Sequence, residues 1–159
     1  MATRVQLAIM EGLSRLGDLY EWGAKPLLTG RRSTDCSGFG QIMVAKAGIE
    51  RIEKDGKSIG IRSWAGSVVQ YNWCRDIPVA AALGKGGIGT FLFIAPRGNK
   101  AGHVAFSLGN GYTLEARGSE GVCICGPDVN GHAAGSRVVP GKRTWDRAGK
   151  LDQLFEEAA

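Results

Sequence analysis

Residues 102–116 read GHVAFSLGNGYTLEA, and this stretch decides the fold. In its first half, His, Ala and Ser at positions 103, 105 and 107 alternate with the larger apolar residues Val, Phe and Leu at positions 104, 106 and 108. This is the pattern of a strand with one buried face. The Gly-Asn-Gly sequence that follows is a turn signal, and a second strand continues from it. If the turn has three residues, Ala105 pairs with Glu115, and Glu115 then lies on the same face as His103. A two-residue turn would place Glu115 on the opposite face.

Further short β-type runs surround this hairpin. Turns that contain glycine separate runs at residues 91–95, 103–108, 112–116 and 122–125. This pattern predicts a small antiparallel sheet. Beyond the sheet, we expect a loop over residues 127–140 and a closing helix over residues 146–157.

The first half of the chain carries helical patterns instead. Apolar residues recur at helical spacing between Thr3 and Asp18, and Thr3 is a suitable cap. Asp35 precedes a second helical stretch at residues 36–48, which ends at a glycine. Helices first and strands after indicate an α+β fold, with N-terminal helices packed on a small antiparallel sheet.

The segments between these helices contain many turn-forming residues. Residues 20–34 read as loop and residues 51–60 as a polar, irregular stretch, whereas a short helix is expected around residues 63–73. A length of 159 residues suits one core, so we expect a single catalytic domain over residues 1–159.

The overall composition limits the possible partners. A formal charge of +5 favours association with anionic polymers such as nucleic acid, teichoic acid or cell wall, without choosing among them. The scattered basic residues lack the interleaved aromatics of a nucleic-acid surface. No stretch approaches the ~20 apolar residues of a membrane span, and the N-terminus lacks a signal peptide. We therefore expect a protein that is made in the cytoplasm and has no stable membrane association. We also expect a monomer.

Cys36 is the candidate nucleophile. A cysteine in the first turn of a helix lies near unpaired amide groups, which predicts a lowered pKa for its thiol. The small residues after it, Ser37 and Gly38, leave the sulfur approachable and the first amides of the helix free to bind an oxyanion. The alternative is an ordinary buried cysteine near a helix start.

A thiolate nucleophile needs a proton carrier, and the chain has two histidines. His103 begins the alternating strand, whereas His132 lies between glycines in a loop and is expected at the surface. Glu115 is the candidate for orienting the His103 ring through its second nitrogen. The alternative for Glu115 is an exposed carboxylate paired with Arg117, an arginine that could also hold a substrate carboxylate.

The remaining cysteines and the tryptophans have simpler interpretations. Cys123 and Cys125 share a strand face, but a zinc site with His132 would lack a fourth ligand, so we expect packing there and at Cys74. We expect no metal ion and no cofactor. At least two of the four tryptophans should lie in the core.

The sequence DCSGF at a helix start, followed by GHVAFSLGNGYTLEA, resembles the NlpC-type family of papain-like cell-wall cysteine peptidases. YEWGA and GTFLFIAP also resemble segments of that family. The resemblance implies a catalytic triad of Cys36, His103 and Glu115, where Glu115 departs from the histidine, asparagine or glutamine of many members. It also implies substrate or oxyanion contacts by the residues near the nucleophile, Tyr20, Asp35 and Ser37.

The resemblance further implies a peptidase that cuts stem or crosslink peptides of bacterial peptidoglycan. Without a signal peptide, a phage lysin or a tail-associated lysin that acts at the cell wall is expected. Two alternatives remain open: a papain-like amidase or acyltransferase with another substrate, and a non-catalytic module for wall binding or tail assembly.

Overall fold

The first helix begins at the predicted cap. In the computed structural model, which describes residues 2–127, 137–141 and 143–157, helix α1 spans Arg4–Ser14. The Thr3 hydroxyl accepts from the Gln6 amide, and the Gln6 side chain accepts from the Thr3 amide, which forms a capping box. His132 lies outside the described residues, so its expected surface position stays a prediction.

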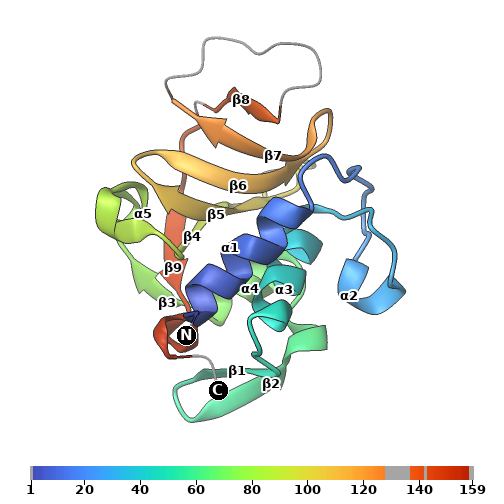
Figure 1. Ribbon diagram of the computed structural model, residues 1–159. Coiled ribbons are helices and arrows are strands. Elements are labelled where there is room, and N and C mark those ends of the chain that lie inside the picture. Colours follow the sequence, from blue (N-terminus) through green and yellow to red (C-terminus); the bar gives the residue numbers. More distant parts are fainter. Residues whose placement is uncertain (1, 128–136, 142, 158–159) are drawn as a thin grey trace.

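Helix α3, Cys36–Lys46, is the central helix of the molecule (Figure 1). Asp35 caps it as predicted, and Gly48 follows it with a φ of 92° that favours glycine. Helix α1 packs on it closely, since a Cβ at Gly12 would lie 2.9 Å from the Met43 methyl carbon. The short helix α2, Pro26–Thr29, interrupts the loop that was expected over residues 20–34.

The four predicted strands are all present. They are β4 (Phe91–Ile94), β5 (His103–Gly109), β6 (Tyr112–Arg117) and β7 (Gly121–Gly126). Each is antiparallel to the next. They form the middle of a seven-stranded sheet with the order β3-β9-β4-β5-β6-β7-β8.

The turn between β5 and β6 differs from the predicted three-residue turn. Gly109 pairs with Tyr112 across a two-residue turn, in which both Asn110 and Gly111 have positive φ. A β-bulge absorbs one residue, because Ser107 already pairs with Thr113. The extra residue restores the predicted register, so Glu115 still shares a face with His103.

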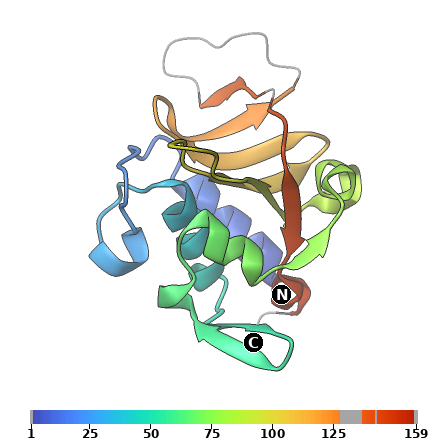
Figure 2. The ribbon, with the colours of Figure 1, turned by 180° about the vertical axis from the view of Figure 1, so that it is seen from behind.

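The expected closing helix over residues 146–157 is wrong. Strand β9, Arg147–Lys150, fills the gap between β3 (Arg75–Ile77) and β4, and only the 3₁₀ helix η3, Asp152–Phe155, follows it. Figure 2 shows β9 in red beside the green β3. Gly149 permits the close approach, since a Cβ there would lie 2.4 Å from the Cβ of Cys74.

Two other segments are more ordered than predicted. Residues 51–60 form a hairpin of β1 (Arg51–Lys54) and β2 (Lys57–Gly60), which turns at an Asp-Gly pair with positive φ. Strand β8, Val138–Pro140, lies within the expected loop and pairs in parallel with β7.

The remaining helices are short. They are η1 (Ile61–Ser63), α4 (Ser67–Asn72), α5 (Val79–Leu83) and η2 (Lys85–Gly87). The expected helix around residues 63–73 therefore corresponds mainly to α4. Across the part of the chain that the structure describes, no helix has the length and apolar character that crossing a membrane requires.

The main core lies between helices α1 and α3 and one face of the sheet. Phe39 and Met43 of α3 are buried there with Phe91, Phe106 and Leu114 of the strands. A smaller cluster of Ala82, Leu92 and Ala148 packs with α5. Trp64 is fully buried in the core, whereas Trp73 and Trp145 are half-buried against the two clusters, so one tryptophan rather than the expected two lies in the core.

Candidate active site

Cys36 is the first residue of α3, and its position is fixed by the residues on either side. One Asp35 carboxylate oxygen accepts from the Gly38 amide at 2.7 Å, and the other forms an ion pair with Lys25. Gly38 lies against the preceding loop, since a Cβ there would come within 2.5 Å of the Ala24 carbonyl oxygen. Cys36 is therefore held by a cap, an ion pair and a close backbone contact.

The predicted low pKa of Cys36 is wrong for the resting protein. Burial raises the pKa of its thiol most strongly, and the nearby Asp35 carboxylate raises it further. Backbone hydrogen bonds from Val104 and Ser37, together with the Lys25 charge, oppose this without reversing it. The sulfur is therefore a neutral thiol at rest, and a base must take its proton before it can attack.

His103 and Glu115 form a direct pair, as the predicted register requires. His103 Nε2 lies 2.8 Å from Glu115 Oε1, and the other Glu115 oxygen accepts from the Thr113 hydroxyl at 2.5 Å. The Glu115 side chain is 1% exposed. The exposed ion pair with Arg117 is therefore ruled out, and the Arg117 guanidinium instead donates to the Pro140 carbonyl.

Glu115 is ionised despite its burial. Burial is the largest influence and opposes ionisation, but the hydrogen bond and charge of His103, the Arg143 charge and the Thr113 hydroxyl together lower the pKa of Glu115. Because the carboxylate binds Nε2, Nδ1 is the ring nitrogen of His103 that is left to exchange a proton.

Two residues beside this pair were missed by the sequence reasoning. Arg143 Nη1 lies 3.3 Å from Glu115 Oε1, and Trp145 stacks on the His103 ring with centroids 6.1 Å apart and planes at 23°. Arg143 also lies over the Trp145 ring at 5.9 Å. In the sequence, Arg143 is only one half of a basic Lys-Arg pair, and no spacing signal links it to residue 115.

A cleft of about 380 Å³ connects the nucleophile to the strand of the histidine. Cys36 lines it together with Ala101 and Gly102, which directly precede His103. The Val104 amide, which follows His103, points at the Cys36 sulfur. The structure thus places the backbone on either side of His103 close to Cys36.

The predicted contact residues lie around the same cleft. Tyr20, Asp35 and Ser37 all line it, together with Lys25 and Trp22, whose side chain is 75% exposed. Burial raises the pKa of the Tyr20 hydroxyl, and the negative charges of Cys36, when it is a thiolate, and of Asp35 raise it further, which keeps the hydroxyl protonated and able to donate. The Ser37 hydroxyl donates to Asp35 at 3.2 Å.

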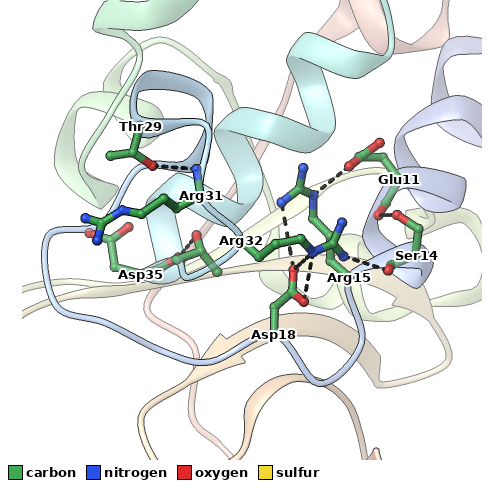
Figure 3. A network of polar contacts seen from close by, with 9 residues as sticks. Glu11, Ser14, Arg15, Asp18, Thr29, Arg31, Arg32 and Asp35 are labelled. Carbon is green, nitrogen blue, oxygen red and sulfur yellow. Dashed lines mark hydrogen bonds and ion pairs between the residues drawn. The ribbon is translucent and has the colours of Figure 1, made fainter.

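A polar network anchors the loop that carries Tyr20 (Figure 3). Asp18 accepts from Arg32 at 3.1 Å, and Arg32 also donates to the Ser14 carbonyl at 2.9 Å. Arg15 pairs with Glu11 at 2.5 Å and lies 3.8 Å from Asp18. The two ends of the loop at residues 18 and 32 are thereby tied to the end of α1.

The other cysteines are structural, as predicted. Cys74 is buried in the main core, and Cys123 and Cys125 are buried with Val139, their sulfurs 3.7 Å apart. Within the described residues, no three histidine, cysteine, aspartate or glutamate side chains gather as metal ligands would.

An α+β fold with a cysteine at a helix start, beside two adjacent strands that carry a histidine and the carboxylate paired with it, defines the papain-like class of proteins. The model of the NlpC/P60 family matches residues 17–131 of this chain. The chain belongs to the NlpC/P60 family.

Two similar proteins are mycobacterial. Peptidoglycan endopeptidase RipB of Mycobacterium tuberculosis is 32% identical over 123 residues, which cover 77% of this chain and 47% of RipB. Peptidoglycan endopeptidase RipA of Mycolicibacterium smegmatis is 34% identical over 112 residues, which cover 70% of this chain and 21% of RipA. The chain thus spans half or less of these relatives.

Solved structures support the fold. The P60 domain of an antigen from M. avium subspecies paratuberculosis superposes with a TM-score of 0.62 at 22% identity, and the match covers 96% of both chains. The structure of RipB from M. tuberculosis gives a TM-score of 0.60 at 23% identity, over 93% of this chain and 64% of that one. These matches confirm the α+β papain-like fold that the sequence predicts.

Proposed function

We propose that the protein is a peptidoglycan endopeptidase that uses a Cys36–His103–Glu115 thiol mechanism. The observation that carries the proposal is that Cys36 shares a cleft with Gly102 and accepts from the Val104 amide, the two residues on either side of His103, whose ring is paired with the buried Glu115. Two relatives that are at least 32% identical are named peptidoglycan endopeptidases. The net charge of +5 suits a substrate in an anionic wall.

The reaction begins with the neutral Cys36 thiol. His103 Nδ1 takes the thiol proton as the sulfur attacks the peptide carbonyl carbon. The carbonyl oxygen becomes an oxyanion, which accepts from the Cys36 backbone amide and the Tyr20 hydroxyl. His103 then gives its proton to the leaving nitrogen as the carbon–nitrogen bond breaks.

Water completes the cycle. It loses a proton to His103 as its oxygen attacks the thioester carbon, and the carboxylic acid product leaves as the carbon–sulfur bond breaks. The proton on His103 returns to the Cys36 sulfur. Throughout, the Glu115 carboxylate holds Nε2 and stabilises the charged imidazole ring.

The test is release of soluble fragments from purified peptidoglycan by the wild type and by Cys36→Ala. We expect release by the wild type alone, and mass spectrometry of the new amine termini then names the bond. Release by both proteins would show a contaminant. No release by either, over several wall types, would favour an amidase or acyltransferase with another substrate, or a wall-binding module.

We also propose a lysin as the biological setting, either a phage lysin released late in infection or a tail-associated one. The sequence expectation favours a lysin over a wall-remodelling enzyme. A lysin should clear a suspension of permeabilised bacteria within minutes at low concentration. Fragment release from purified walls without clearing of cells would favour remodelling.

A further inference from the structure

A second pocket of about 220 Å³ adjoins the catalytic cleft. Both are lined by Ser67, Val68 and Pro96, so the pocket continues the cleft past the short helix α4. Tyr71 and Phe93 form its apolar wall, with their rings edge to face at 5.3 Å. A pocket of this size suits one side chain of a bound peptide.

Arg147 of strand β9 is the one arginine that lines this pocket among the described residues. Its guanidinium lies over the Tyr71 ring at 4.8 Å, which fixes the side chain. Within the described residues Arg147 forms no ion pair. By contrast, carboxylates pair with Arg32, Arg75, Arg97 and Arg143. The hydrogen-bonding edge of Arg147 is therefore available to a ligand.

The acidic residues near the pocket already have partners. Asp146 pairs with Arg97 at 2.5 Å and accepts from the Ala95 amide at 2.8 Å. Asp76 accepts from the Tyr71 hydroxyl at 2.6 Å. Neither carboxylate therefore neutralises Arg147 by direct contact, and the positive charge faces the pocket.

We propose that this pocket binds an acidic residue of the substrate peptide, with its aliphatic part against Tyr71 and Phe93 and its carboxylate on Arg147. The inference rests on the proposed function, because it takes the occupant to be a peptidoglycan stem peptide. An apolar wall that ends in an unpaired guanidinium matches a short aliphatic chain with a terminal carboxylate. The α-carboxylate of a γ-linked glutamyl residue and the side-chain carboxylate of a diaminopimelyl residue share this chemistry.

The test measures binding in a Cys36→Ala background, where no cleavage occurs. Calorimetry would compare the tripeptide L-alanyl-γ-D-glutamyl-diaminopimelate with two forms of it, one amidated at the glutamyl carboxyl and one at the diaminopimelyl side-chain carboxyl. Arg147→Gln should bind the free acid about tenfold more weakly, which is about 1.4 kcal/mol. The peptide amidated at the carboxyl that Arg147 contacts should bind the parent protein about tenfold more weakly than the free acid does. Arg147→Gln should not weaken the binding of that amidated peptide any further.

Arg75→Gln is the matched control, because Arg75 also lies on the sheet but pairs with Asp152 at 2.9 Å and lines neither pocket. Equal affinity of Arg147→Gln and its parent for the free acid would overturn the proposal. So would an equal loss for all three peptides, or no binding by the parent. Since binding is read without turnover, these results are separate from fragment release, which tests the proposed function.

Discussion

Replacing Glu115 by glutamine tests the proposed catalytic role of the His103–Glu115 pair most directly. The substitution keeps the side-chain shape but removes the charge that lies 2.8 Å from His103 Nε2 in a nearly dry site. The glutamine NH₂ group can also donate to Nε2, which would favour the opposite tautomer of the ring. Both effects weaken His103 as a proton carrier.

The magnitude follows from the geometry. Two unit charges at 2.8 Å would attract by about 6 kcal/mol at an effective dielectric constant of about 20, which is a ceiling. The net value of a hydrogen bond to a charged group is about 1.5–3 kcal/mol. At about 1.36 kcal/mol per factor of ten, kcat/KM should fall roughly 10- to 150-fold.

The assay is the initial rate of fragment release from purified peptidoglycan, with Glu53→Gln as the control. Glu53 is an exposed carboxylate on the hairpin of β1 and β2, so its variant should keep the wild-type rate. The melting temperature of each variant shows whether it is folded. A loss below threefold in a folded Glu115→Gln protein would refute the assigned role of the carboxylate.

Three further predictions concern pH and packing. Because the pKa of Glu115 is lowered in the folded protein, its ionisation stabilises the fold above the ordinary glutamate pKa of about 4.3. The difference in melting temperature between wild type and Glu115→Gln should therefore shrink as the pH falls below that value. Because burial raises the pKa of Cys36, its alkylation by iodoacetamide in His103→Ala should have a pH midpoint above the ordinary cysteine value of about 8.5, and a midpoint near 7 would contradict the assigned resting state. Gly38→Ala would bring a Cβ within 2.5 Å of the Ala24 carbonyl oxygen and should cost about 1–3 kcal/mol in urea unfolding, whereas Gly56→Ala, with no atom within 4 Å, tests the effect of positive φ alone.

The sequence predicts the elements whose signals are local. Asp35 identifies the start of α3, and alternation identifies the strand that His103 begins. The register of Glu115 was also right, although the turn was not, because a bulge compensates for the shorter turn. The sheet face on which Glu115 lies depends on both the length of the turn and the presence of the bulge.

What the sequence misses depends on long-range contacts. Residues 147–150 show no strand alternation, and they become a strand only because β3 and β4 offer backbone partners on both sides. The contacts of Arg143 and Trp145 with the catalytic pair follow from that placement. The pKa of Cys36 was mispredicted for a related reason, since burial by distant residues outweighs the helix start.

The position of β9 also determines when the proposed active site can be completed during synthesis. Cys36, His103 and Glu115 all leave the ribosome before residues 147–150, yet β3 and β4 have no common neighbour until those residues arrive. Trp145, which stacks on the histidine, emerges just before them. The nascent chain therefore holds all three residues of the proposed triad for a period before the sheet that supports them can close.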